Sequence, residues 1–109
     1  SFGEWKKVGQ NNQGKVYLDF ERIRKNQSYV YFWEMRDILI PNKMGVKSGI
    51  TYKQGDCNLF RYKILTDTFY TNFEGKGKVL HSSNTPDKEW TYPRPGTGNE
   101  QVLNIICRK

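Results

Sequence analysis

The sequence predicts an α+β domain in which about six antiparallel strands form a sheet and one C-terminal helix packs on a face of that sheet. Most segments alternate apolar and polar residues with period two, which is typical of half-buried strands. The last segment instead places its apolar residues at helical spacing, so that they form one stripe. The chain has 109 residues, which is the length of one domain and leaves no room for two. We therefore treat residues 1–109 as a single domain.

The first half of the chain predicts two short strands, a helical turn and a long central strand. Residues 5–8 and 15–19 alternate, and the polar segment 9–14 between them is typical of a hairpin connection. Residues 20–25 predict one helical turn, with Asp19 as its N-cap. Residues 29–36 carry the strongest strand pattern of the chain. Their first five residues are apolar, which indicates a central strand that is covered on both faces.

The second half predicts three further strands and a long loop. Residues 47–53 form a short strand with Ile50 and Tyr52 on one face, and residues 58–70 form a long strand. Gly75 and Gly77 mark a turn, after which residues 78–82 continue as the last strand. Residues 83–98 contain three prolines and predict a loop that is anchored by Trp90.

The C-terminal segment predicts the helix. Thr97 and Glu100 have the spacing of a capping box, in which each side chain accepts a hydrogen bond from the other residue's backbone N–H. The apolar stripe of the helix follows, and it consists of Val102, Leu103, Ile106 and Cys107. Such a stripe needs a surface to cover, and the central strand supplies one. We therefore expect Trp33 of that strand to be a core residue, with the helix lying over Trp33 or its neighbours.

The composition excludes disordered chains and membrane-spanning helices. Aromatic residues make up 15% of the chain, whereas disordered chains are poor in them. The longest apolar runs fall far short of the ~18 residues that a spanning helix needs. The net charge is +7, and the basic residues are spread over both halves of the chain. This distribution favours a solvated basic surface over a dedicated nucleic-acid footprint.

The reactive residues argue against an enzyme, and we assign no catalytic, cofactor-binding or metal-ligating residues. His81 is the one histidine, and its spacing from the two cysteines matches no zinc pattern. A nucleophilic pair of Cys57 with His81 would be forbidden by a disulfide at Cys57. Two carboxylate pairs are expected to be surface ion pairs with basic neighbours, namely Glu34 with Asp37 and Asp87 with Glu89.

The aromatic residues are the one positive functional signal. Five of them lie near lysine or arginine on predicted strands, as in sheets that stack single-stranded nucleic acid: Tyr29, Tyr31, Trp33, Phe60 and Tyr62. Our leading interpretation is that these rings form a core beneath the helix. A single-stranded nucleic-acid-binding module that uses basic and aromatic sheet residues is the alternative.

The two cysteines bear on the compartment. Cys57 and Cys107 are an even count, which is compatible with one disulfide. Two buried thiols and one reactive thiol are the alternatives that the residues leave open. A bridge would close about 50 residues and would be worth ~4 kcal/mol in the chain-entropy model. It would also indicate an oxidising compartment.

Several short motifs follow one another along the chain in a distinctive order. They are Trp5; Tyr17-Leu18-Asp19 followed by Ile23; Val30-Tyr31-Phe32-Trp33; Asp56-Cys57; Arg61 and Tyr70 before Gly75; Trp90; Pro95-Gly96-Thr97; and Cys107. This order resembles that of the bacterial surface-adhesin protein E-like family over nearly the whole chain. The resemblance implies an antiparallel sheet with a C-terminal helix that is held to it by one disulfide, and hence a Cys57–Cys107 bridge. The resemblance assigns no binding residues in this chain.

The resemblance also implies a class of function, because one member of the family is an outer-surface lipoprotein that binds host adhesive glycoproteins such as vitronectin and laminin. We therefore expect an exported, non-enzymatic binding or structural domain, adhesin-like, in the periplasm, on the cell surface or secreted. Its expected partner is a protein or an anionic polymer at the cell exterior, and no cofactor is expected. A dimer through an exposed sheet edge is compatible with this interpretation.

Overall fold

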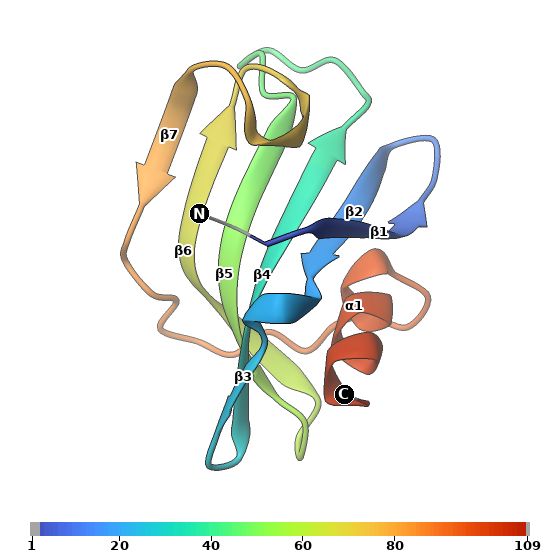
Figure 1. The fold of residues 1–109 in the computed structure, drawn as a ribbon, viewed down its shortest axis with the longest axis vertical. Coiled ribbons are helices and arrows are strands. Elements are labelled where there is room, and N and C mark those ends of the chain that lie inside the picture. The colour runs from blue at the N-terminus through green and yellow to red at the C-terminus, as the bar shows by residue number, and fades with distance from the viewer. Residues whose placement is uncertain (1–2, 109) are drawn as a thin grey trace.

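The computed structural model describes residues 3–108, which form one antiparallel sheet and one α-helix (Figure 1). Seven strands lie in this part of the chain, in the order β1-β2-β4-β5-β6-β7, with β3 paired to β4 off this path. The strands are β1 Trp5–Gln10, β2 Gly14–Asp19, β3 Arg24–Asn26, β4 Tyr29–Ile38, β5 Ser48–Asp56, β6 Arg61–Tyr70 and β7 Val79–Ser83. The helix α1 spans Gly98–Cys107, and there are two 3₁₀ turns, η1 (Phe20–Arg22) and η2 (Phe73–Gly75). The predicted α+β class is confirmed, with one strand more than expected.

Strands β4 and β5 form the centre of the sheet. They pair along nearly their whole length, from Tyr29 opposite Asp56 to Asp37 opposite Ser48. Two strands share the other edge of β4, because β3 pairs with its beginning and β2 pairs with its end. The apolar segment that begins at residue 29 is therefore a central strand, as predicted.

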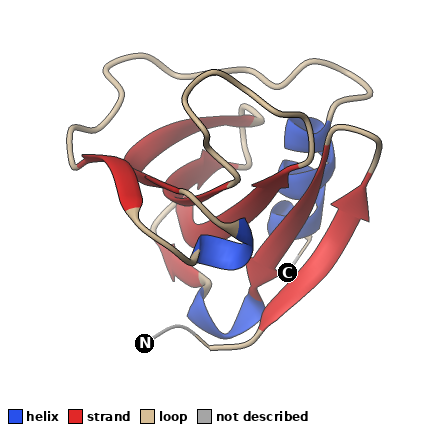
Figure 2. Ribbon diagram, turned by 90° about the horizontal axis from the view of Figure 1, so that it is seen from above, coloured by secondary structure: helices blue, strands red, loops and turns tan. Residues whose placement is uncertain are grey.

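Successive side chains of β4 point to opposite faces of the sheet. We call the face that carries Val30 and Phe32 the core face, and the face that carries Tyr29 and Tyr31 the tyrosine face. One core cluster unites α1 with the core-face residues of β2 and β4, and its buried members are Val16, Leu18, Val30, Phe32, Val102 and Ile106. Burial of one such side chain stabilises the fold by ~1.5–3 kcal/mol. Figure 2 shows α1 beside the twisted sheet.

The prediction that Trp33 is a core residue is wrong. Trp33 is half-buried and pairs with Tyr52 on the tyrosine face, where the two ring centroids lie 4.6 Å apart. Its neighbour Phe32 is 1% exposed and lies in one core cluster with Ile106 of α1. The apolar run from residue 29 to residue 33 looks the same on both faces, so the pattern alone does not show which face meets the helix.

The N-terminus of α1 is capped as the sequence predicts, with one difference. Thr97 Oγ1 accepts a hydrogen bond from Glu100 N at 3.3 Å. The Glu100 carboxylate accepts from Gly96 N at 2.9 Å instead of from Thr97 N. Thr97 N is already engaged, because it donates to the carbonyl oxygen of Arg94. The reciprocal bond of the capping box is thus displaced by one residue.

Replacing Thr97 with Ala is expected to lower the free energy of unfolding by about 1 kcal/mol, because the first turn of α1 loses its side-chain acceptor. Chemical denaturation followed by circular dichroism measures the change. Thr85 is an exposed loop residue and provides a matched control, since Thr85→Ala removes the same atoms away from any helix. The control should change the free energy by less than about 0.5 kcal/mol. Equal changes in the two variants would contradict the capping role.

A disulfide joins the end of α1 to the sheet. Cys57 directly follows β5, and Cys107 is the last residue of α1; their Cα atoms are 5.6 Å apart and their sulfur atoms are bonded. This confirms the pairing that the family resemblance implies. The helix is therefore fixed at both ends, by the Thr97 cap at its start and by the bridge at its end.

Two segments differ from the sequence prediction. The helical turn after Asp19 is shorter than expected, because η1 ends at Arg22 and residues 24–26 form the additional strand β3. The long strand begins at Arg61 and not at residue 58, since residues 57–60 form a turn in which Phe60 has a φ of 54°. Within residues 3–108 we find no helix with the length and apolar character required to cross a membrane.

Candidate binding surface

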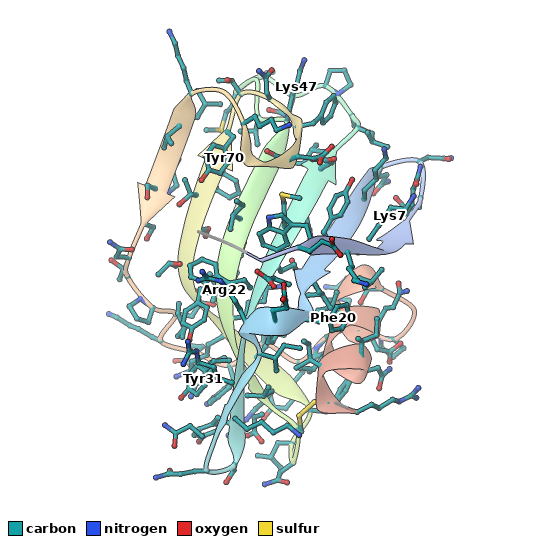
Figure 3. The ribbon with its side chains drawn as sticks, in the orientation of Figure 1. Lys7, Phe20, Arg22, Tyr31, Lys47 and Tyr70 are labelled. Carbon is teal, nitrogen blue, oxygen red and sulfur yellow. A yellow bond between two sulfur atoms is a disulfide. The ribbon has the colours of Figure 1, made fainter. Side chains whose placement is uncertain are left out.

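Two rows of side chains cross four neighbouring strands on the tyrosine face. The residues of each row lie directly opposite one another in the strand register. Directly opposite residues point to the same face of a sheet, so each row is contiguous. The first row is Arg24, Tyr31, Gln54 and Lys63, and the second is Asn26, Tyr29, Asp56 and Arg61. Figure 3 marks this part of the sheet by Tyr31, at the end remote from η2.

Hydrogen bonds and an ion pair hold three of the polar members of the rows in place, namely Gln54, Asp56 and Arg61. Gln54 Nε2 donates to the Tyr31 hydroxyl oxygen at 3.2 Å. Arg61 Nε donates to Asp56 Oδ2 at 2.8 Å, and the Asp56 side chain is only 6% exposed. Burial alone would raise the pKa of Asp56, but Arg61 and two backbone N–H groups of the following turn hold this pKa below its ordinary value. Asp56 is therefore ionised at neutral pH, and Arg61 neutralises its charge.

The segment that carries Trp90 is held beside β6, after the end of β7. Thr91 and Tyr62 exchange two backbone hydrogen bonds of 2.8 and 2.9 Å. Asp87 N donates to the carbonyl oxygen of Ile64 at 2.8 Å, and Ile64 N donates to Asp87 Oδ2 at 2.9 Å. Through these bonds the segment of residues 87–91 pairs with β6 beyond the end of β7, and this pairing places the Trp90 ring over the two rows.

The Trp90 ring orders two cations and one tyrosine. It stacks on Tyr29, with 5.7 Å between the ring centroids. The guanidinium carbon of Arg61 lies 4.3 Å from the centroid of the Trp90 ring, and Lys63 Nζ lies 4.9 Å from it. A cation within ~6 Å of an indole centroid is attracted by the negative face of the ring. We call the resulting surface the cation–aromatic face, and it consists of Arg24, Tyr29, Tyr31, Arg61, Lys63 and Trp90.

Further rings extend this surface. The Tyr52 ring lies between Tyr31, at 6.2 Å, and Trp33, at 4.6 Å between centroids. Tyr92 is 60% exposed and accepts a hydrogen bond from Arg61 Nη1 at 3.3 Å. Aromatic and basic side chains therefore lie close together from β3 to the segment beyond β6.

The structure divides the five aromatic residues that the sequence analysis singled out. Tyr29, Tyr31 and Trp33 lie together on the tyrosine face, whereas Tyr62 is buried on the core face and Phe60 lies in a turn. Trp90 was missed as a member, although its role as a loop anchor was predicted. The sequence signal was the alternation of basic residues 61 and 63 in a strand, but only the long-range pairing of residues 87–91 with β6 brings Trp90 to them.

A second charged cluster is buried on the core face. Glu34 and Lys53 form an ion pair of 2.9 Å, with side chains that are 3% and 6% exposed. Arg36 Nε donates a further bond to Glu34 at 2.7 Å, and its Nη2 donates to Asn99 Oδ1 of α1 at 2.7 Å. Lys53 Nζ also lies 4.7 Å from the centroid of the Tyr62 ring. The cluster thus connects β4, β5 and α1.

The buried cluster corrects the prediction of a surface ion pair at Glu34 and Asp37. Burial alone would raise the pKa of Glu34, but the cations of Lys53 and Arg36 hold this pKa below its ordinary value. Burial lowers the pKa of Lys53, against the attraction of Glu34. Asp37 is also buried, but it lies on the opposite face and accepts a hydrogen bond from Glu74 N at 2.8 Å. The two carboxylates therefore do not share a site.

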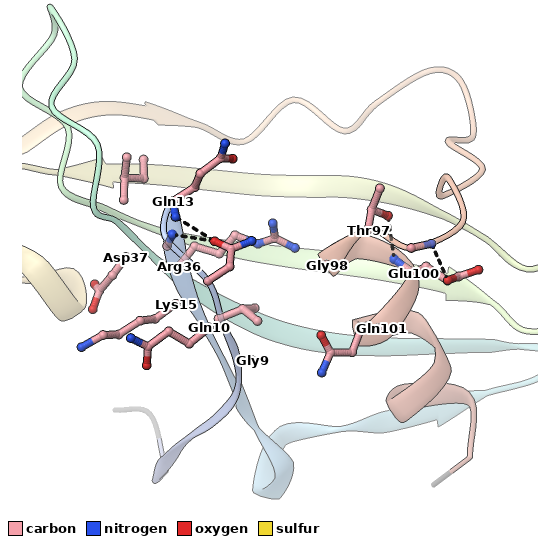
Figure 4. Close-up of a pocket in the computed structure, with 15 residues that line it drawn as sticks. Gly9, Gln10, Gln13, Lys15, Arg36, Asp37, Thr97, Gly98, Glu100 and Gln101 are labelled. Carbon is pink, nitrogen blue, oxygen red and sulfur yellow. Dashed lines mark hydrogen bonds between the residues drawn. The ribbon is translucent and has the colours of Figure 1, made fainter.

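A pocket of about 510 Å³ lies between the β1–β2 turn, the end of β4 and the start of α1 (Figure 4). Polar groups at its helical end are engaged within the protein. Gln101 Nε2 donates to the carbonyl oxygen of Val8 at 2.8 Å, and Glu100 accepts from Gly96. Arg36, which also lines the pocket, is bonded to Glu34 and Asn99. These bonds join α1 to the sheet.

The remaining reactive residues are kept apart. Cys57 is oxidised in the disulfide, so it does not form a nucleophilic pair with His81. His81 lies on β7 and stacks on Phe69, with 5.9 Å between the ring centroids. In the part of the chain that the structure describes, no group of three His, Cys, Asp or Glu side chains is arranged to hold a metal ion.

Comparison with known proteins identifies relatives of the whole chain. A family model described as surface-adhesin protein E matches residues 5–108. A solved structure of Haemophilus influenzae protein E is 22% identical, covers 95% of this chain and 83% of that chain, and gives a TM-score of 0.67. Protein E from non-typeable Haemophilus influenzae is 19% identical, with 95% and 75% covered and a TM-score of 0.63. A comparison with curated proteins gave no match.

Proposed function

Because this chain belongs to the surface-adhesin protein E family, we propose that it is an exported, non-enzymatic binding domain that acts outside the cytoplasm. The observation that carries this proposal is the cation–aromatic face, where rings and cations are held in fixed positions. The Cys57–Cys107 bridge supports the location, since disulfides persist in oxidising compartments. The domain would act in the periplasm, on the cell surface or as a secreted protein.

The cation–aromatic face suits binding because most of its side chains are held by contacts within the protein before a partner arrives. Ordering a long side chain during binding costs ~0.5–1.5 kcal/mol. The contacts of Arg61 and Lys63 with Trp90 order these two side chains before binding, so less conformational freedom is lost when a partner binds. Aromatic residues and arginine also dominate the energetic centres of protein interfaces. The partner that we propose is a protein or an anionic polymer outside the cell.

Two carboxylates with a lowered pKa support the proposal that the domain is not an enzyme. A carboxylate that serves as a general acid or base works best when its pKa lies near the working pH. The pKa of Glu34 and the pKa of Asp56 are both held below their ordinary values by neighbouring cations. Both groups are therefore permanently ionised at neutral pH, and each is committed to a structural ion pair.

We assign the helix a scaffold role, in which α1 covers the core face of β4 and β5. A Cβ atom on Gly55 would lie 3.1 Å from Leu103 Cδ1, so the core side of this position faces α1. The adjacent residues Gln54 and Asp56 point to the opposite face and into the two rows. A helix in this place stiffens the sheet and leaves the cation–aromatic face to partners.

Beads coated with the purified chain are expected to bind an immobilised matrix of vitronectin and laminin. The Lys63→Glu variant is expected to weaken this binding by about tenfold or more, which is about 1.4 kcal/mol, because it reverses a charge at the centre of the face. Bead retention under flow measures the effect.

Lys78 provides the control for charge. It is exposed and precedes β7, at the end of the sheet remote from the two rows, so Lys78→Glu changes the net charge equally without touching the face. Lys78→Glu should bind as the wild type does. Equal loss in both variants, or no retention of wild-type beads on either glycoprotein, would overturn the proposed function.

A further inference from the structure

We propose that the cation–aromatic face binds a densely charged anionic polysaccharide, whose acidic groups bridge Arg24, Lys63 and Arg61. This inference rests on the proposed function and names the chemistry of its partner. It concerns the surface made by the two rows and Trp90, and not the pocket at the start of α1.

The first argument is charge. Arg24 is exposed, and neither it nor Lys63 forms an ion pair with a carboxylate among residues 3–108. Asp56 is the one carboxylate in the two rows, and it is buried beneath Arg61 and neutralised by it. The rows therefore carry a net positive charge, and the complementary partner is a polyanion.

The second argument is the arrangement of the cations. Arg24 and Lys63 occupy the two ends of one row that crosses β3, β4, β5 and β6. With ~4.8 Å between neighbouring strands, their backbones are about 14 Å apart. Arg61 lies in the adjacent row, next to Lys63. A linear polymer with closely spaced acidic groups can contact all three cations at once, whereas a single small anion cannot.

The third argument concerns hydrogen bonding by the tyrosine between these cations. The Tyr31 hydroxyl accepts from Gln54 Nε2, so its own O–H remains able to donate to an acceptor. It lies between Arg24 and Lys63 in the row. Hydroxyl and acidic oxygens of a sugar chain are suitable acceptors there.

The occupied aromatic rings and the paired strands of the face favour a polysaccharide over a nucleic acid or a peptide. Single-stranded nucleic acid binds by stacking its bases on free aromatic faces. The Trp90 ring already contacts Tyr29, Arg61 and Lys63, and the Tyr52 ring already contacts Tyr31 and Trp33. A peptide needs either a free strand edge or pockets for anchor side chains. In the rows, β4 and β5 are paired on both sides, and β3, which pairs with β4 only, is three residues long. A hydrated sugar chain that lies across the sheet needs neither feature.

Heparin is the probe for the test, and its dissociation constant is measured by calorimetry between about 50 and 200 mM salt. The double variant Arg24→Gln/Lys63→Gln is expected to raise the dissociation constant about tenfold, because two charge contacts are lost. The slope of log Kd against log salt should fall by about 2 units, one for each cation removed. Both side chains lie outside the core, so the melting temperature should stay that of the wild type.

The matched control is Lys43→Gln/Lys78→Gln, which removes the same charge at the other end of the sheet, where the β4–β5 loop and the start of β7 lie. It should change heparin binding by less than about twofold. Equal weakening in both double variants would show that only net charge matters and would overturn the inference. Hyaluronan, which carries carboxylates at lower density, should bind more weakly than heparin, and tighter binding would also overturn it.

Two further outcomes are decisive. Tighter binding of single-stranded DNA than of heparin, with the same dependence on Arg24 and Lys63, would replace the polysaccharide by nucleic acid. Absence of heparin binding, with retention on vitronectin and laminin intact, would overturn this inference and leave the proposed function standing. Loss of retention on these glycoproteins, with heparin binding intact, would overturn the proposed function and leave the assignment of the polysaccharide site standing.

Discussion

Reduction of the Cys57–Cys107 disulfide is expected to lower the free energy of unfolding by about 4 kcal/mol. The bridge spans a sequence separation of 50 residues, so its loss restores a large amount of conformational freedom to the unfolded chain. Typical domains of this size are stable by only ~5–15 kcal/mol, so the reduced protein should be close to unfolding at physiological temperature. Urea denaturation with and without reductant measures the change, and the Cys57→Ser/Cys107→Ser variant should reproduce it.

The order in which the reduced protein loosens is also expected to be specific. The bridge fixes the last residue of α1, whereas the sheet is held by pairing along β4 and β5. Amide hydrogen exchange in α1 should therefore accelerate more than exchange in β5. A uniform acceleration through the whole chain would contradict a local tether. A change in unfolding free energy below about 1 kcal/mol would contradict the stabilising role itself.

The strands of the sheet were largely predictable, because a half-buried strand alternates apolar residues, which face the core, with polar residues, which face the solvent. At the start of β6, residues 61–64 alternate between basic and aromatic or aliphatic side chains, and the strand was expected. β3 was missed because all three of its residues are polar and exposed, so it carries no alternation. Its pairing with the start of β4 is imposed by the turn at residues 27–28, where Gln27 has a φ of 60°.

The faces of the sheet were harder to predict than its strands. β4 begins with an apolar run, and the sequence did not show whether Phe32 or Trp33 meets the helix. That choice depends on the register between β4 and its neighbours, because a shift by one residue exchanges the two faces. The disulfide joins residues that are distant in the chain; the even count of two cysteines was compatible with it, and the family resemblance implied it.

The candidate site was the least predictable part, because it is made by contacts between distant segments. Arg61 and Lys63 are recognisable as basic strand residues, but Trp90 reaches them only through the segment paired with β6. The buried pair of Glu34 and Lys53 has a separation of 19 residues. Nothing in the local pattern distinguishes either residue from a solvated surface charge, so the sequence prediction placed Glu34 at the surface.

Replacing Glu34 with Gln is expected to lower the free energy of unfolding by about 3–5 kcal/mol, because it leaves the buried Lys53 cation without its partner. Lys53 is 5% exposed, and Glu34 Oε1 is its one hydrogen-bonded carboxylate oxygen in the described chain. The variant keeps the size of the side chain, so the loss reports charge and not a cavity. Lys53→Met added to Glu34→Gln should recover most of the loss, since a neutral pair needs no compensation.

The pH dependence of stability separates this account from a packing defect. In the wild type the pKa of Glu34 is held below its ordinary value of 4.5, so its contribution is present above pH 4.5 and is lost as the pH falls through the lowered value. Glu34→Gln should lack this loss of stability at acid pH.

In the Glu34→Gln variant the pKa of Lys53 should fall further below its ordinary value of 10.5, because burial and Arg36 both oppose the cation and only Asp67 favours it. The folded variant then binds fewer protons than the unfolded chain, so its stability should rise with pH up to about 10.5. A variant that stays equally destabilised from pH 5 to pH 10, or a double variant no more stable than Glu34→Gln, would contradict the buried ion pair as the cause.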